Sequence, residues 1–309
     1  MRTLLACSLL AALAAAHAQT GVEKPTQLVD VNHLGLDKIE TTKNGGLRIG
    51  AGVRNTDAAN HPTVRKNYPL LSQALLAGAS AQLRNMATVG GNLMQRTRCD
   101  YFVDTGFEHC NKRKPGSGCA ALKGWNRTHA IFGASEQCVA VNPSDMNVAL
   151  VALDAVINVQ GSDGERQIRA ADFHRLPGDQ PQIDTTLKHG ELITSLDLPK
   201  SSATQNAYYL KLRERNSYAF ALVSVAVALN MSGRTIQSGR IVIGGVAHKP
   251  WFAKSASTSL SGKSFDAVDF AAIAAQAVEG AKPLSQNAYK IPMAKGAVER
   301  ALRLATEAT

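Results

Sequence analysis

The amino-acid sequence predicts an α+β fold in two domains, and three observations support this prediction. Short β-like runs and amphipathic helical runs alternate along the chain without an internal repeat. A polar stretch, residues 201–206, has the composition of a linker. The length of 309 residues and the hydrophobic fraction of 45% suffice for two domains with full cores. We therefore expect a larger domain over residues 21–202 and a smaller α+β domain over residues 206–309.

The larger domain begins with β-like runs and continues with helices. Residues 27–31 and 46–50 predict two short strands. Apolar residues at i, i+3 and i+4 predict a helix over residues 68–76. Ser144 is expected to be the N-cap of a second helix that carries one apolar face. The turn sequence Gly-Ser-Asp-Gly at residues 161–164 predicts a hairpin between two flanking strands.

The smaller domain shows three β-rich runs followed by two helical runs. The change of period from strand-like to helix-like patterns predicts a mixed α+β unit. The five runs lie at residues 208–212, 221–227, 240–243, 265–278 and 292–305.

The first twenty residues have the form of a secretory leader. Met1-Arg2 is a short basic start, residues 4–16 are apolar, and residues 16–18 have the small-x-small pattern of a signal-peptidase site. The apolar run is too short to span a bilayer as a helix, and no later segment is apolar enough to do so. The pattern predicts either a working signal peptide, with the mature chain starting near Gln19, or a mis-started N-terminus.

Composition argues against a nucleic-acid partner. The net charge is +10, from 34 basic and 24 acidic residues, but only 5% of the residues are aromatic. Binding of single-stranded nucleic acid uses aromatic platforms, and no helix-turn-helix, zinc-finger or RNA-binding signature accompanies the charge. Several basic residues surround the cysteine segment described next, where they suit an anionic cofactor or a sulfide-rich cluster equally well.

Four cysteines are the most informative feature of the middle of the chain. They lie in an irregular, Gly-, Asn- and Arg-rich loop at residues 98–139. Their spacing lacks the close Cys-x-x-Cys pairs of a zinc ribbon. Four thiolates on one loop can hold an iron–sulfur cluster or form two disulfides, and the spacing leaves both interpretations open. The four are Cys99, Cys110, Cys119 and Cys138.

A glycine pair precedes the cysteines. Thr88 and Asn92 flank Val89, Gly90 and Gly91. Paired glycines let the backbone approach a ligand and point N–H groups at phosphate oxygens. The plainer interpretation is a tight glycine turn.

Residues 88–92 resemble the second flavin-binding loop of the FAD subunits of molybdenum hydroxylases, the xanthine dehydrogenase and carbon monoxide dehydrogenase group, and residues 143–153 resemble the segment that follows this loop in that family. The sequence around each cysteine resembles one branch of that family, the FAD subunits of periplasmic aldehyde oxidoreductases, whose inserted loop carries a [4Fe-4S] cluster. The segments that carry this second likeness are residues 98–102, 110–113, 115–119, 135–138, 172–179 and 240–247.

The resemblance implies an electron-transfer subunit rather than a catalytic one. A partner subunit would oxidise an aldehyde at a molybdenum cofactor, and a second partner would carry two [2Fe-2S] clusters. This chain would receive electrons on FAD and pass them to an external acceptor, in a periplasmic heterotrimer, or in the cytoplasm if the leader-like start is an artefact. The implied fold is a FAD-binding domain of the molybdopterin-dehydrogenase type followed by a C-terminal domain of the CO-dehydrogenase flavoprotein type.

The resemblance also implies site residues, with no catalytic residue on this chain. The glycine loop would contact the FAD pyrophosphate or ribityl chain, Asp145 would accept a hydrogen bond from FAD, and Leu192 and Lys211 would lie near the isoalloxazine. The four cysteines would bind the [4Fe-4S] cluster. The loop residues are Thr88, Gly90, Gly91 and Asn92.

The chain departs from the family at its start. Family members begin with a subdomain that carries a first glycine-rich loop of the Ala-Gly-Gly-Thr-Asn kind, and nothing here matches it. We therefore expect a truncated FAD-binding domain with weakened FAD retention. The alternative function is a secreted, disulfide-bonded binding or scaffold protein derived from such a subunit.

Overall fold

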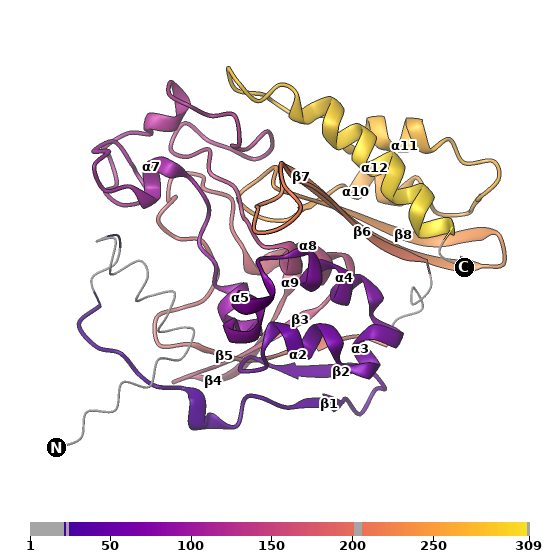
Figure 1. Cartoon of the computed structure of the whole chain (residues 1–309), viewed down its shortest axis with the longest axis horizontal. Coiled ribbons are helices and arrows are strands. Elements are labelled where there is room, and N and C mark those ends of the chain that lie inside the picture. The colour runs from indigo at the N-terminus through magenta and orange to yellow at the C-terminus, as the bar shows by residue number, and fades with distance from the viewer. Residues whose placement is uncertain (1–21, 23–24, 201–205, 308–309) are drawn as a thin grey trace.

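The computed structural model describes residues 22, 25–200 and 206–307. Two five-stranded antiparallel sheets form its framework, with helices between and outside them (Figure 1). The leader-like residues 1–20 and most of the expected linker lie outside the described residues. No helix in the described part is long and apolar enough to cross a membrane.

The first sheet has the strand order β1-β2-β5-β3-β4. β2 confirms the strand expected at residues 46–50, and β3 and β4 confirm the hairpin, which closes where Gly161 pairs with Gly164. Gly164 has a φ of +105°, a conformation that favours glycine. The strands are β1 (Ile39–Thr41), β2 (Leu47–Gly50), β3 (Val156–Gly161), β4 (Gly164–Arg169) and β5 (Leu192–Leu198).

The prediction of a strand at residues 27–31 is wrong. This run forms no strand, and only a short 3-10 helix, η1 (Asn32–Leu34), follows it. Leu28 and Val29 are 60% and 69% exposed, so the run has neither a buried face nor a neighbouring strand to supply backbone partners.

Helices cover one face of the first sheet. The helix expected at residues 68–76 is confirmed as α4, whose first position is Pro69, where the missing N–H has no cost. The helix expected after Ser144 is confirmed as α8, and the Ser144 Oγ accepts the Asn147 N–H at 3.1 Å. The helices are α2 (Asn55–Asn60), α3 (Pro62–Asn67), α4 (Pro69–Ala77), α5 (Ala81–Met86), α6 (Val89–Leu93), α8 (Asp145–Ala152) and α9 (Ala170–Phe173).

The second sheet has the order β10-β8-β7-β6, with β9 paired to β8. The three β-rich runs of the sequence correspond to β6, β7 and β8. Successive residues of β7 face opposite sides: Val225 and Val227 belong to the outer core, and Ala226 and Ala228 to the inner one. The strands are β6 (Ala207–Leu212), β7 (Val223–Ser232), β8 (Thr235–Gly244), β9 (Trp251–Phe252) and β10 (Lys263–Ser264).

The second sheet lies between two layers of helices. α12 packs on its outer face, and α4 and α8 contact its inner face. α8 is therefore buried on all sides rather than on the single face that the sequence suggests. α11 and α12 confirm the two predicted C-terminal helices with shifted ends. The outer helices are α10 (Lys254–Thr258), α11 (Phe270–Ala277) and α12 (Lys290–Glu307).

The cysteine segment is largely irregular, as predicted. It contains only α7 (Asp100–Val103) and the 3-10 helix η2 (Ala120–Leu122). In Figure 1 it forms the magenta lobe around α7, above the first sheet and beside the second. Its base is fixed by a bridge between Arg98 and Val141, which brings its two ends together.

Candidate functional site

The glycine loop starts a short helix. Thr88 is the N-cap of α6, and its Oγ accepts the Gly91 N–H at 3.1 Å. The expectation that these glycines aim free N–H groups at phosphate is wrong, because the loop amides donate within the chain. Val89, Gly90, Gly91 and Asn92 donate to the Val53 carbonyl, the Ala51 carbonyl, the Thr88 hydroxyl and the Thr88 carbonyl respectively.

Close packing explains one of the glycines. A Cβ on Gly90 would lie 3.0 Å from the Ala51 Cβ and 3.1 Å from the Ala51 carbonyl oxygen. Gly90 therefore allows α6 to rest on the chain that leaves β2. This contact places the Thr88 side chain at the wall of a cleft.

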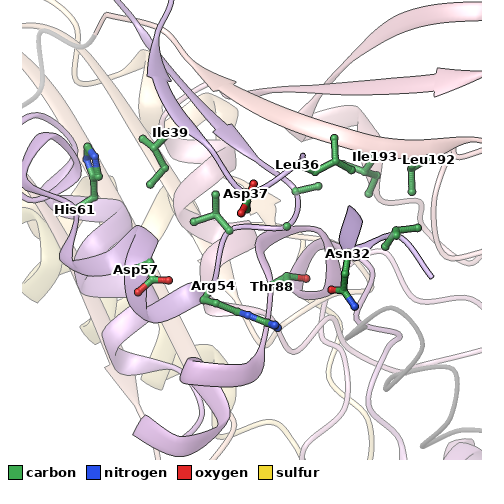
Figure 2. Close-up of a pocket in the computed structure, with 14 residues that line it drawn as sticks. Asn32, Leu36, Asp37, Ile39, Arg54, Asp57, His61, Thr88, Leu192 and Ile193 are labelled. Atoms are coloured by element: carbon green, nitrogen blue, oxygen red, sulfur yellow. The ribbon is translucent and has the colours of Figure 1, made fainter. Parts of the chain in front are cut away.

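The cleft has a volume of about 510 Å³ and lies between the segment before β1, the end of β2 and β5. Thr88 and Leu192, two of the residues expected at the flavin, line it (Figure 2). Gly90, Gly91 and Asn92 are not among the residues that line it. Asn92 instead accepts hydrogen bonds at its Oδ1 from the Ser144 hydroxyl at 2.7 Å and from Gln95 at 2.6 Å.

Three polar residues that the sequence reasoning missed also line the cleft. Arg54, Asp57 and His61 come from the start and end of α2 and stand along its wall in Figure 2. The buried Nδ1 of His61 has no partner in the described part of the chain. Their only sequence signal is a cluster of polar residues just after a strand, which is also typical of an ordinary loop.

Asp145 and Lys211 form a buried pair away from this cleft. The Lys211 Nζ lies 2.8 Å from the Asp145 Oδ2 and 3.0 Å from the Ala77 carbonyl oxygen. The Tyr209 hydroxyl donates to the other carboxylate oxygen at 2.5 Å. Burial raises the pKa of Asp145, and the charge of Lys211 opposes that shift. The triad joins α8 of the first unit to β6 of the second.

Asp145 also borders a second cavity, of only about 20 Å³, together with Arg98 and Phe220. The Arg98 guanidinium lies over the Phe220 ring, 4.8 Å from its centroid. This small cavity lies between the residue preceding Cys99 and the loop after β6. The roles of Asp145 and Lys211 at a flavin remain predictions.

All four cysteines of the segment are free thiols in the structure. Cys110 and Cys119 face each other across an antiparallel bridge, and Cys138 pairs with Ser135. Burial, together with the charge of Cys138, raises the pKa of Cys99 to about 12. Burial raises the pKa of Cys138 to about 11, although Lys112 opposes the shift. Buried thiols of high pKa are unsuited to act as free nucleophiles.

The sulfurs lie within electrostatic range of one another but do not form a single-ion site. Cys99 interacts with Cys138 and Cys119, and Cys138 interacts with Cys119 and Cys110. Across the described ranges, no three His, Cys, Asp or Glu side chains come close enough to hold one metal ion. A cubane cluster places four irons between its thiolates, so its ligands are spread more widely than those of a single ion.

A buried ion-pair network supports the cysteine loop. The Lys112 Nζ is fully buried and lies 2.5 Å from the Asp184 Oδ1 and 2.6 Å from the Pro181 carbonyl oxygen. The Arg96 Nε lies 2.7 Å from the other Asp184 oxygen. Burial alone would raise the pKa of Asp184, but the charges of Lys112 and Arg96 outweigh it and hold the pKa below its ordinary value.

One buried histidine, His129, contacts a cysteine, and a second, His248, lies within electrostatic range of His129. The His129 Nε2 is 3.2 Å from the Cys99 Sγ. Burial, together with the charge of Lys290, lowers the pKa of His129 to about 4, and burial lowers the pKa of His248 to about 3. Both rings are therefore neutral near pH 7. Several buried polar atoms here lack a partner within the described residues: Arg98 Nε, His129 Nδ1, His248 Nδ1 and His248 Nε2.

The fold has two α+β units, and the first contains a cleft lined by polar and apolar residues. Comparison with known proteins gives its class. Residues 12–201 match the family described as the FAD binding domain in molybdopterin dehydrogenase, and residues 207–305 match the CO dehydrogenase flavoprotein C-terminal domain. The chain belongs to this molybdenum hydroxylase flavoprotein family and is an oxidoreductase subunit.

Individual relatives agree with this assignment. The chain is 52% identical to the aldehyde oxidoreductase FAD-binding subunit PaoB of Escherichia coli over 280 residues, which cover 89% of this chain and 83% of that protein. It is 28% identical to the glyceraldehyde dehydrogenase medium chain of Sulfolobus acidocaldarius over 243 residues, 78% of this chain and 68% of that one. A CO dehydrogenase chain from Oligotropha carboxidovorans shares the fold, with a TM-score of 0.71, 22% identity, and coverage of 98% of this chain and 96% of that one.

Proposed function

We propose that this chain is the FAD- and iron–sulfur-carrying electron-transfer subunit of a molybdenum-dependent aldehyde oxidoreductase. The observation that carries the proposal is the cleft at the N-cap of α6, in a chain that belongs to a FAD-binding family. The 52% identity to an aldehyde oxidoreductase FAD-binding subunit supports the aldehyde oxidoreductase class.

The residues of the cleft suit one part of a dinucleotide. The Thr88 hydroxyl oxygen accepts the Gly91 N–H, so the hydroxyl proton is still available to donate to a ligand. Arg54 brings a positive charge, which suits a diphosphate. Leu192 offers an apolar surface beside them. Bound FAD would supply electron-accepting chemistry, while these side chains would bind and orient it.

The cysteine segment suits a [4Fe-4S] cluster as its ligand set. Four free cysteines lie on one loop, and Cys99 interacts electrostatically with Cys119 and Cys138. The His129 ring contacts the Cys99 sulfur through Nε2, and its buried Nδ1 has no partner in the described residues. Iron coordination deprotonates a thiol that burial otherwise keeps protonated. We infer that Cys99, Cys110, Cys119 and Cys138 hold the cluster.

Partners and location follow from the same proposal. A molybdenum-cofactor subunit would oxidise the aldehyde and a [2Fe-2S] subunit would connect it to this chain, which would pass electrons to an external acceptor. The leader-like start favours the periplasm. The secreted scaffold remains the competing function, and the state of the four cysteines distinguishes the two.

Direct FAD titration of the whole chain tests the flavin site. Arg54→Met removes the positive charge at the cleft, and we expect FAD affinity to fall about ten-fold, or roughly 1.4 kcal/mol. Arg303→Met, on the exposed face of α12, is the matched control and should leave the affinity unchanged. Equal affinity in the wild type and Arg54→Met would show that FAD does not use this cleft.

A further inference from the structure

The contact between His129 and Cys99 has a geometry that ordinary core packing does not require. The imidazole is 1% exposed, and its Nε2 points at the Cys99 sulfur at 3.2 Å. Its other nitrogen has no partner in the described part of the chain. The backbone of Asn126 also interacts with this ring and favours its charged form. Among the described residues, the Cys99 sulfur is its one side-chain hydrogen-bonding partner.

The backbone of His129 is held in place by the C-terminal unit. The His129 carbonyl oxygen accepts hydrogen bonds from Asn287 Nδ2 and from Lys290 Nζ, both at 3.1 Å. Both donor side chains are 0% exposed. Lys290 also donates to the Thr128 and Gly245 carbonyl oxygens, each at 2.7 Å. These contacts fix where the imidazole can point.

Chemistry fixes the direction of the hydrogen bond once the sulfur is a ligand. A metal-bound thiolate has no proton to give, so the Nε2 must carry the proton and donate it. Hydrogen bonds to ligand sulfurs stabilise the more negative, reduced state of an iron–sulfur cluster, and thereby raise its reduction potential.

We propose that His129 is a positioning residue that donates its Nε2–H to the Cys99 thiolate, orienting this ligand and making the group bound by the four cysteines easier to reduce. The inference rests on the [4Fe-4S] cluster proposed above. It assigns a function to the C-terminal unit as well, because Asn287 and Lys290 of that unit hold the donor.

Redox titration of the anaerobically purified whole chain, followed by electron paramagnetic resonance, tests the inference together with iron analysis. We expect His129→Phe to retain its iron but to show a midpoint potential below that of the wild type. His129→Gln, whose amide can still donate, should recover part of the shift. His109→Gln is the matched control, because His109 lies in the same loop but contacts the Ser117 carbonyl oxygen at 2.8 Å.

The outcomes separate this inference from the cluster itself. A wild-type chain without iron would overturn both. An iron-loaded wild type whose potential is unchanged in His129→Phe would overturn only the role of His129. Loss of iron from both the Phe and Gln variants would contradict a donor role, since it would show that the imidazole ring itself is required.

Discussion

At the scale of single residues, the Asp145–Lys211 pair joins the two halves of the molecule through buried charges. The Asp145 and Lys211 side chains are 8% and 4% exposed. Removing one partner of a buried pair leaves the other charge without compensation. Lys211→Met should therefore lower the free energy of unfolding by about 3–5 kcal/mol, measured by urea denaturation.

The surface pair of Arg48 and Asp197 provides the control for that prediction. Its arginine side chain is 49% exposed, so Arg48→Met should cost only about 0–1 kcal/mol. A cost for Lys211→Met as small as that for Arg48→Met would contradict the view that the buried pair secures the interface.

Asp184 predicts a pH dependence at the same scale. Its pKa in the folded protein lies below the ordinary value of 3.8, because Lys112 and Arg96 outweigh the effect of burial. A carboxylate with a depressed folded pKa stabilises the protein above its unfolded pKa, and that stability is lost as the pH falls through the folded pKa. The stability difference between the wild type and Asp184→Asn should therefore be largest near neutral pH and shrink below about pH 4.

Urea denaturation at several pH values measures this difference. A wild-type advantage over Asp184→Asn that stays constant from pH 7 to pH 3 would contradict the charge assignment. Asp163→Asn, at an exposed hairpin turn, serves as the control and should show little difference at any of these pH values.

At the scale of elements, Ser144 connects the glycine loop to α8. Its hydroxyl oxygen accepts the Asn147 N–H, and its proton goes to the Asn92 Oδ1. Ser144→Ala should cost about 0.5–2 kcal/mol of stability through the lost cap. It should also weaken FAD binding, because α6 and Thr88 lose a contact that positions them.

A second N-cap separates these two effects. Ser80 caps α5 by accepting the Leu83 N–H at 3.3 Å and does not line the cleft. Ser80→Ala should lower stability to a similar extent while leaving FAD affinity unchanged, as measured by flavin titration. Equal losses of affinity in both variants would mean that the effect is general destabilisation.

Several elements could be predicted because their signals are local. The N-cap at Ser144, the apolar spacing of the helix at residues 68–76 and the turn at residues 161–164 each depend on a few neighbouring residues. The prediction of a strand at residues 27–31 failed because a strand needs a neighbouring strand to pair with, and the local sequence pattern does not show whether one is present. The prediction of free glycine amides failed partly for a similar reason, since the acceptor of Gly90, the Ala51 carbonyl, is far away in sequence, whereas Gly91 donates to the nearby Thr88 hydroxyl.

At the scale of the whole molecule, Gly244 marks where α8 meets the second sheet. A Cβ there would lie 2.3 Å from the Ser224 Oγ and 2.6 Å from the Val148 Cγ2. Gly244→Ala should therefore force the two units apart locally and cost about 1–3 kcal/mol. A Cβ on Gly296, in α12, would meet no atom within 4 Å, so Gly296→Ala should stabilise the helix by about 0.5–1 kcal/mol.

Thermal unfolding of the two glycine variants measures both effects. A Gly244→Ala protein as stable as the wild type would contradict tight packing between α8 and β8.

The site could be predicted only in part, because its residues come together from segments that are far apart in the sequence. Cys99 and His129 are thirty residues apart, and the lysine that holds His129 lies in a different unit.

The central claim, a flavoprotein subunit whose cysteine segment binds an iron–sulfur cluster, is tested most directly by iron and sulfide analysis of the anaerobically purified chain. We predict a brown protein with about four irons per chain and visible absorbance that dithionite bleaches. A colourless protein without free thiols, whose mass rises by two protons for each disulfide on reduction, would contradict it and favour the disulfide-bonded scaffold.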